Sequence, residues 1–309
     1  MSVLVVGSVA LDSVETPFGS TTDALGGSAV YFSASASLFH PVQLVGVVGN
    51  DFPEDELKFL RGRGVDLSGL DRADGESFRW DGFYSYDLNV AETRDTKLGV
   101  FADFRPEIPD VFRDADWLFL ANIDPELQLE VLEQVDAPRL VAADTMNFWI
   151  EGKREALLDV VSRVDLLMIN DGEARELSGE YNLLLAARWI QERGPELVVV
   201  KKGEHGAMLF TPDLIFFAPG FPLEEIFDPT GAGDSFAGGF LGYLAAVGEI
   251  SAAELKQAMV CGSAMGSFAV ERFSVGRLKE LTAADVEDRV RAFREMTSFE
   301  QPMMADAHV

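Results

Sequence analysis

Short runs of apolar, often β-branched residues alternate with longer segments of helical periodicity along most of the chain. The runs predict strands at residues 3–6, 42–48, 117–120, 140–143, 166–169 and 197–200, and a hairpin at 208–210 and 215–217. The periodic segments predict helices at residues 28–38, 55–63, 125–134, 153–161, 173–177 and 183–192. This alternation is typical of a mainly parallel sheet that helices cover. The pattern therefore predicts an α/β fold.

Two regions depart from the alternation. Residues 77–104 form an insertion rich in aromatic and β-forming residues, among them Trp80 and Tyr84. The insertion fits two arrangements equally well: a lid over one end of the sheet, or an edge hairpin that packs only on its own domain. After Asp234, two uncharged segments rich in Gly, Ala and Ser, 235–248 and 257–270, predict helices that pack closely on each other or on a ligand.

Composition narrows the class of protein. Of 309 residues, 48% are hydrophobic and 25% charged, as in ordinary globular proteins. The 52 acidic against 25 basic residues give a net charge of −27, which repels nucleic acid and anionic membrane surfaces. The basic residues comprise seven Lys and eighteen Arg. This surface fits either a protein adapted to high salt or an acidic protein of an ordinary cytoplasm.

Cysteine and histidine usage points to a reducing compartment without a zinc site. Cys261 is the single cysteine, so no intramolecular disulfide can form, and the three histidines lack zinc-ligand spacing. The first residues contain no basic segment followed by a long apolar run, and no segment reaches the ~20 apolar residues of a membrane span. We therefore expect a cytoplasmic protein.

The segment Asp228-Pro229-Thr230-Gly231-Ala232-Gly233-Asp234-Ser235 carries the strongest chemical signal. Its glycines allow a tight turn into a helix, so that backbone N–H groups and the helix dipole converge on an anion. Asp234 would lie in the first helical turn, where a carboxylate can take a proton from a hydroxyl group. The dipole should keep Asp234 ionised and weakly basic, which suffices if phosphoryl transfer is loose. A glycine turn with an Asp helix cap explains the shorter Gly-Ala-Gly-Asp string equally well.

The longer string through Gly239 resembles the signature of the ribokinase family of sugar and nucleoside kinases, the PfkB-type carbohydrate kinases. The resemblance runs in order from Val3 to about Leu278. It implies a three-layer α/β/α domain over residues 1–297, a β-rich lid formed by about 10–24 and 77–104, and a flexible tail at 298–309. It also implies that Asp234 is the catalytic base and that Gly231, Ala232 and Gly233 form the anion hole.

The same resemblance implies a substrate site near the N-terminus. Asp12 matches the family's hydroxyl-binding Asp, and Gly26 and Gly27 match its paired lid-hinge glycines. Many sugar-specific members have an Asn where this chain has Tyr31. Tyr31, with aromatic residues of the insertion, could instead receive a nucleoside base or a bulkier sugar, or these residues could belong to the core or a dimer interface.

The nucleotide side is implied by three further matches. Asn170 and Glu173 match an Asn-x-x-Glu motif that organises Mg²⁺ and phosphates through water, although the same spacing makes a helix capping box. The segment 200–207 matches the loop that holds ribose and phosphates. The cofactor-binding candidates taken from these matches and from the adenine-side helix are Asn170, Glu173, Lys202, Gly203, Gly206 and Ser263.

The resemblance also implies ATP and Mg²⁺ as cofactors, with Glu173 acting on Mg²⁺ through water. Asp228 and Thr230 match the place where many members bind a monovalent cation such as K⁺. A homodimer through the lid is a further implied partner. Asp144, in the segment 144–147 after a predicted strand, could face the site without an assigned role.

The predicted function is transfer of the γ-phosphoryl group of ATP to a hydroxyl of a small, sugar-like substrate. A nucleoside kinase of the same fold and a non-catalytic sugar or nucleotide sensor are the alternatives; loss of Asp234, Asn170 or Glu173 would have favoured the sensor, and all three are present. The sequence lacks Gly-x-x-x-x-Gly-Lys-Ser/Thr and has no Gly-x-Gly-x-x-Gly after a strand, so neither a P-loop nor a dinucleotide fold is supported. Small molecules, and neither nucleic acid nor membrane, are the expected partners.

Overall fold

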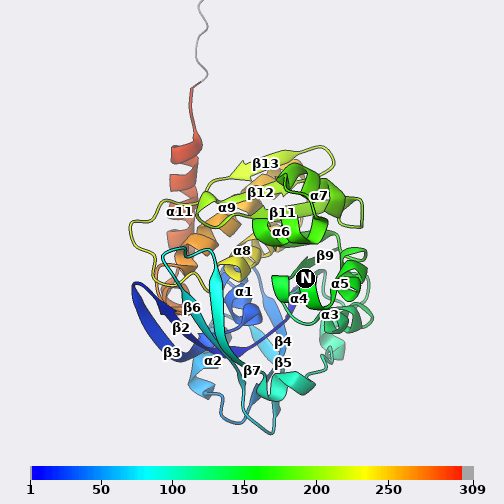
Figure 1. The fold of residues 1–309 in the computed structure, drawn as a ribbon, viewed down its shortest axis with the longest axis vertical. Coiled ribbons are helices and arrows are strands. Elements are labelled where there is room, and N and C mark those ends of the chain that lie inside the picture. The colour runs from blue at the N-terminus through cyan, green and yellow to red at the C-terminus, as the bar shows by residue number, and fades with distance from the viewer. Residues whose placement is uncertain (1, 301–309) are drawn as a thin grey trace, which may run out of the picture.

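A nine-stranded main sheet forms the centre of the computed structural model, which describes residues 2–300 (Figure 1). The strand order is β13-β12-β11-β10-β9-β8-β1-β4-β5, parallel from β11 to β5 and antiparallel at β12 and β13. The strands are β1 (Val3–Val6), β4 (Val42–Gly49), β5 (Asp66–Ala73), β8 (Trp117–Leu120), β9 (Leu140–Asp144), β10 (Leu166–Asn170), β11 (Leu197–Lys201), β12 (Ala207–Phe210) and β13 (Ile215–Ala218). The predicted α/β class with a mainly parallel sheet is confirmed.

Helices cover both faces of this sheet, which explains why its central strands are apolar on both sides. In β1, Val3 and Val5 belong to one buried cluster, and Leu4 and Val6 to the other. The first face is covered by α1 (Ser28–Ala36), α2 (Glu54–Gly62), α8 (Ala232–Val247), α9 (Ala252–Ala269), α10 (Gly276–Glu280) and α11 (Ala283–Thr297). The second face is covered by α3 (Pro125–Leu132), α4 (Asn147–Gly152), α5 (Arg154–Val161), α6 (Asp171–Ser178) and α7 (Leu183–Gln191).

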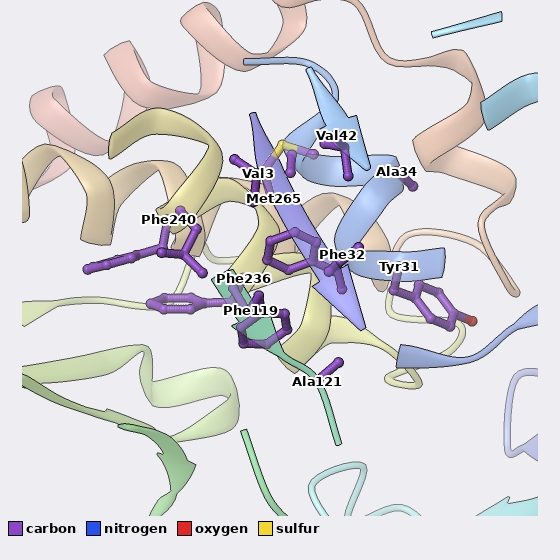
Figure 2. Packing of buried hydrophobic residues seen from close by; sticks show 14 of the residues in the cluster. Val3, Tyr31, Phe32, Ala34, Val42, Phe119, Ala121, Phe236, Phe240 and Met265 are labelled. Carbon is purple, nitrogen blue, oxygen red and sulfur yellow. The ribbon is translucent and has the colours of Figure 1, made fainter. Parts of the chain in front are cut away.

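Small residues let α8 approach its neighbours, as the sequence predicted. A Cβ added at Gly238 would lie 2.4 Å from the carbonyl oxygen of Phe32 in α1, and one at Gly239 would lie 2.7 Å from a side-chain carbon of Met265 in α9. Figure 2 shows the aromatic side chains that fill the remaining space, with Phe32 stacked on Phe119 at 4.4 Å between ring centroids. Close packing therefore fixes the position of α8 and of its N-terminus.

A second, four-stranded sheet lies beside the main one, in the order β3-β2-β6-β7 (Figure 1). Its strands are β2 (Ala10–Thr16), β3 (Gly19–Gly26), β6 (Phe78–Tyr84) and β7 (Ala91–Lys97). Both segments predicted for the lid are thus strands of one sheet that is separate from the edge of the main sheet. Its opening and closing, and a homodimer through it, stay predictions.

Four elements were not predicted: β5, α4, α10 and α11. In β5 one residue of eight, Gly69, is buried, so its sequence carries no apolar run. The helix α8 begins at Ala232, three residues before the uncharged stretch 235–248, and Asp234 lies in its first turn as predicted. The predicted tail at 298–309 lies outside the described residues from 301 onward. Among the helices of residues 2–300, none is long and apolar enough to cross a membrane.

Candidate active site

Three neighbouring parallel strands end in polar residues at the same edge of the main sheet. β9 ends at Asp144, β10 at Asn170 and β11 at Lys201, and the register pairs Asn170 with Lys201. The carboxyl ends of parallel strands are where α/β folds bind ligands, because the loops that follow them open a crevice there. The N-terminus of α8 lies at this edge, since Lys201 Nζ is 3.1 Å from the position that a Cβ would take at Gly233.

Lys201 and Asp144 form a buried ion pair at this edge, with Nζ 2.6 Å from Oδ2 and side chains 16% and 5% exposed. The other carboxylate oxygen of Asp144 accepts the backbone N–H of Thr145 at 2.9 Å. Gln128 on α3 is also buried, and its Nε2 donates to the carbonyl oxygens of Ala121 and Asp144 at 2.9 and 3.1 Å. Gln128, from the helix layer on the second face of the sheet, therefore holds the ends of β8 and β9 and with them the ion pair.

The turn before α8 has the geometry of an anion-binding site. Gly231 is left-handed (φ 72°, ψ 4°), which a glycine adopts without strain. In the first helical turn, the N–H of Ala232 bonds the carbonyl oxygen of Pro229 at 3.2 Å, so Ala232 does not offer the free N–H group that the predicted anion hole needs. The N–H groups of Gly233 and Asp234 have no backbone carbonyl partner in the described chain. They and the positive end of the dipole face the same point. The predicted residues Gly231, Ala232, Gly233 and Asp234 are thus together in one turn.

Asp234 is more basic than the helix dipole alone predicts. Burial raises the pKa of its carboxyl group to about 7, and the Asp144 carboxylate adds to the rise while Lys201 opposes it. The sequence-based expectation of an ionised, weakly basic Asp234 neglected this desolvation. The carboxyl group therefore titrates in the range where it can accept a proton and release it again.

Asp12 lies on β2 beside the paired glycines. A Cβ at Gly26 would lie 1.9 Å from Asp12 Oδ2, so this close approach requires glycine. Gly27 has φ 96° and directly precedes α1, and its N–H bonds the Asp12 carboxylate. Burial raises the pKa of Asp12 to about 7, with further increases from the carboxylates of Asp228 and Asp234. The fold therefore brings Asp12 and Asp234 into one acidic site.

Tyr31 also faces this site, but its ring is not an open platform. A Cβ at Gly231 would lie 2.2 Å from Cγ of the ring, so the ring lies against the anion-binding turn. In Figure 2 the oxygen of Tyr31 points away from the labelled core residues. This hydroxyl is buried and has no hydrogen-bond partner among residues 2–300. Its pKa is raised well above the usual value by burial and then by Asp228 and Asp12.

Two aromatic residues of the insertion lie in different places. Tyr84 is buried, and its hydroxyl accepts a hydrogen bond from Thr230 Oγ1 at 3.3 Å, which ties the second sheet to the turn before α8. Trp80 packs over Gly82 and donates its Nε1–H to Thr93 at 3.1 Å, within the second sheet. The structure therefore brings Tyr84 to the site and leaves Trp80 within the second sheet.

Asp228 is a buried acidic residue just before the turn that leads into α8. Its carboxylate is fully buried and accepts the backbone N–H groups of Thr230 and Ser274, both at 2.9 Å. Burial raises the pKa of this carboxyl group. Within residues 2–300, neither Lys nor Arg forms a salt bridge with it. Both carboxylate oxygens thus accept backbone N–H groups, and the monovalent cation expected at Asp228 and Thr230 stays a prediction.

Asn170 and Glu173 form the capping box that the sequence allowed. Asn170 Oδ1 accepts the N–H of Glu173 at 2.8 Å, and Glu173 Oε2 accepts the N–H of Asn170 at 2.9 Å. Burial raises the pKa of Glu173 to about 7; Lys201 lowers it and Asp144 raises it. No group of three or more His, Cys, Asp or Glu side chains in the described chain could hold a metal by itself. A Mg²⁺ ion here would need phosphate and water oxygens as further ligands, as Mg²⁺ commonly takes.

The remaining nucleotide candidates lie on β11, its loop and α9. Lys202, the predicted phosphate contact, has its Nζ 5.8 Å from the ring centroid of Phe217. Gly203 and Gly206 bound the turn after β11, with φ 52° and 86°. Ser263 is buried on α9, and its hydroxyl has no hydrogen-bond partner in the described chain.

Sequence reasoning missed Lys201 and Gln128 and gave Asp144 no role. A signal existed for Lys201 and Asp144, because each directly follows a predicted apolar strand. The adjacent Lys202 was chosen because the pattern gives no means to decide which lysine faces the crevice. Gln128 lies within a helix, where nothing in the sequence separates a buried amide from a surface one.

Comparison with known proteins agrees with this geometry. Residues 3–281 match the family model described as pfkB family carbohydrate kinase. The cytidine kinase of Thermococcus kodakarensis is 33% identical over 247 residues, which cover 78% of this chain and 87% of that protein.

Two solved structures have the same fold. The nucleoside kinase of Methanocaldococcus jannaschii, an archaeal member of the ribokinase family, aligns with a TM-score of 0.75 at 24% identity, covering 94% of this chain and 98% of that one. The aminoimidazole riboside kinase of Salmonella enterica, solved with aminoimidazole riboside and an ATP analog, aligns with a TM-score of 0.74 at 20% identity, covering 94% and 100%. The chain therefore belongs to the pfkB family of carbohydrate kinases: it has the ribokinase fold and is a phosphotransferase that acts on a hydroxyl group.

Proposed function

We propose that this protein transfers the γ-phosphoryl group of ATP to a hydroxyl on the sugar of a nucleoside, with Asp234 as the base. The observation that carries the proposal is the common site of Asp12 and Asp234 at the anion-binding turn. Asp12 is placed to orient the acceptor, and the first turn of α8 to receive the phosphate. The two carboxylates thus have separate tasks within one buried site.

In the proposed reaction, the acceptor oxygen forms a bond to the γ-phosphorus, and the bond from that phosphorus to the β–γ bridging oxygen breaks. Asp234 takes the proton of the acceptor hydroxyl, and ADP leaves with the bridging electron pair. The N–H groups of Gly233 and Asp234 stabilise the charge on the transferred group, since they are already oriented before the reaction. Burial by the second sheet excludes water, which would otherwise compete as acceptor.

The residues present fit the cofactors that the family resemblance implies. Glu173 offers a carboxylate beside the phosphate end of the site, and would hold Mg²⁺ through water together with phosphate oxygens. When bound, Mg²⁺ supplies charge neutralisation of the phosphates. Asp228 would hold a monovalent cation next to the turn, as its buried carboxylate has no basic side-chain partner in the described chain.

Two observations favour a nucleoside over a simple sugar. The relative that is 33% identical over most of its length is named a cytidine kinase. Tyr31 takes the place of the Asn that sugar-specific members use, and its buried hydroxyl can still bond a polar substrate atom. A sugar kinase remains the alternative within the same chemistry. The sensor alternative is disfavoured because Asp234, Asn170 and Glu173 are all present and lie at one edge of the sheet.

The test is a phosphoryl-transfer panel with Mg-ATP against cytidine and other nucleosides, ribose, fructose and inositol, at low and molar KCl. Product is identified as a phosphate ester by mass, and Asp234→Asn is run beside the wild type. A nucleoside acceptor with kcat/KM at least tenfold above every free sugar supports the proposal. Preference for a free sugar would show that the acceptor is a sugar and not a nucleoside. ATP binding without transfer to any acceptor would favour a sensor.

A further inference from the structure

In the part of the chain that the structure describes, Lys201 has unused hydrogen-bonding capacity beside the first turn of α8. Its ammonium group carries three N–H donors, and Asp144 accepts one of them at 2.6 Å. The group lies 3.1 Å from the Cβ position of Gly233, so it is next to the first turn of α8. Backbone N–H groups and a lysine ammonium group therefore converge from two sides on the same space.

The charge balance of the site also requires a cation. Asp144, Glu173 and Asp234 surround Lys201, each close enough to affect its charge. Burial lowers the pKa of Lys201, but Asp144 and Glu173 outweigh burial, and the pKa lies above its usual value. The ammonium group is therefore charged when a phosphate arrives. The phosphate would otherwise meet three carboxylates and only partial positive charges.

We propose that Lys201 is a catalytic residue that binds the transferred phosphoryl group, and that Asp144 is its positioning residue, held in turn by Gln128. This inference rests on the proposed function and adds a side-chain cation to the backbone anion hole. During transfer Lys201 keeps its proton, because the proton of the acceptor goes to Asp234. Its contribution is electrostatic and grows as charge develops on the phosphoryl oxygens and the bridging oxygen.

Asp144 explains why Lys201 stays at this place. A flexible lysine loses considerable side-chain entropy when it is fixed, and a buried one needs a counter-charge. The carboxylate of Asp144 supplies that charge from the end of β9, two strands away from β11, while the N–H of Thr145 holds the carboxylate and Gln128 holds its backbone. The ammonium group is thus oriented before ATP binds, which is the arrangement that favours a transition state over a ground state.

Lys202, next to Lys201, is the alternative candidate for the phosphate contact, so its variant is compared with that of Lys201. Lys202 lies over Phe217 and was the phosphate contact expected from the sequence. We compare Lys201→Met, Lys202→Met, Lys201→Arg and Asp144→Asn, with Lys58→Met as a surface control, since Lys58 is 70% exposed on α2. Lys201→Met leaves Asp144 buried without a counter-charge, so the double variant Lys201→Met/Asp144→Asn, which removes both charges, keeps the test valid if the single variant fails to fold.

Two readouts separate a phosphate contact from a structural role. Turnover is measured with saturating acceptor, and the dissociation constants of ATP and ADP are measured by calorimetry without acceptor. We expect Lys201→Met and the double variant to lose kcat by about 10²- to 10³-fold. We also expect both to weaken ATP binding about tenfold more than ADP binding, with the acceptor KM changed less than threefold. Lys201→Arg should recover part of kcat because it keeps the cation.

Asp144→Asn should lower kcat by about tenfold and leave the preference for ATP over ADP largely intact, as expected when the lysine is present but less well oriented. The inference is overturned if Lys201→Met, or the double variant, turns over within threefold of wild type and keeps the wild-type ratio of ATP to ADP affinity. It is also overturned if Lys202→Met carries the ATP-specific loss. A wild-type protein that transfers no phosphoryl group would contradict the proposed function, and the ATP and ADP affinities would still decide the role of Lys201.

Discussion

The ring of Tyr31 lies directly against Gly231, the residue that turns the chain into α8. A Cβ at residue 231 would lie 2.2 Å from Cγ of that ring, and the backbone there has φ 72°. Tyr31 belongs to α1 and Gly231 to the turn before α8, so two helices that are far apart in sequence position the anion-binding turn together. The position therefore accepts only glycine without movement of the turn.

Gly231→Ala should lower kcat by about 10²-fold, because displacement of reacting groups by about 1 Å has effects of this size. Gly248→Ala is the matched control: it lies at the other end of α8 with φ 68°, and a Cβ there would meet nothing within 4 Å. Both variants should lose stability from left-handed strain, and Gly231→Ala should show the larger fall in Tm because its Cβ also meets the Tyr31 ring. Equal kcat in the two variants would show that the contact with Tyr31 does not set the turn.

The acidic site should make the protein less stable at higher pH. Asp12, Asp234 and Glu173 have folded pKa values of about 7, above their ordinary range. The folded state therefore holds more protons than the unfolded state between about pH 4 and 7, and the free energy of unfolding falls as pH rises through this window. Asp12→Asn removes one buried carboxylate that destabilises the folded state when it is ionised. The Tm of this variant should therefore exceed that of wild type by about 2–4 °C at pH 8.

The advantage of Asp12→Asn should shrink as the pH is lowered from about 7 and should be gone near pH 4, where the carboxyl group is protonated in both the folded and the unfolded state. Thermal melts at both pH values check this, with phosphoryl transfer as a parallel readout, since the variant should lose activity while it gains stability. A Tm difference that does not depend on pH would mean that burial does not disfavour the ionised form of the Asp12 carboxyl group.

Glu173 has a helix-capping role and a proposed magnesium role that one substitution can separate. Gln at this position can still accept the N–H of Asn170, so Glu173→Gln keeps the capping box while it removes the charge. We expect the Mg²⁺ concentration needed for half-maximal activity to rise several-fold with no fall in Tm, since Gln keeps the cap and removes a carboxylate whose pKa burial raises to about 7. Asn170→Ala, which removes the cap, should instead cost about 1 kcal/mol of stability. An unchanged Mg²⁺ requirement in Glu173→Gln would leave the capping box as its whole function.

The sequence predicted the fold well because most of the main-sheet strands are buried on both faces. Residues such as Val3–Val6 and Leu166–Ile169 are continuous apolar runs, and the glycine turn at 231–233 marks the start of a helix without any structural knowledge. β5 was missed because its residues are mostly exposed or half-buried, and α11 because no apolar run marks it. Patterns thus reveal buried elements more readily than exposed ones.

The site was predictable where a motif is contiguous and unpredictable where side chains meet across strands. Asp234, Gly231 and Asp12 follow from local strings. The Lys201–Asp144 pair joins residues 57 positions apart on strands that are separated by β10, so it depends on strand order. The raised pKa of Asp234 likewise depends on burial by distant segments, whereas the helix dipole, the local effect, predicts a lower pKa.

The acidic composition leads to a prediction about salt. With a net charge of −27, repulsion between carboxylates should destabilise the folded protein where few ions screen them. We propose a surface adapted to high salt, so Tm should rise steadily from dilute buffer to molar KCl. The buried pair of Lys201 and Asp144 should be little affected by this screening. A Tm that is the same at both salt concentrations would favour an ordinary acidic protein.

The measurement that tests the central claim most directly is phosphoryl transfer by Asp234→Asn, with ATP affinity measured on the same preparation. Asparagine keeps the shape and the helix position but cannot take the acceptor proton. We predict a loss of kcat of about 10²- to 10⁴-fold with ATP binding within a few-fold of wild type. Near-normal turnover in this variant would contradict the assignment of Asp234 as the base.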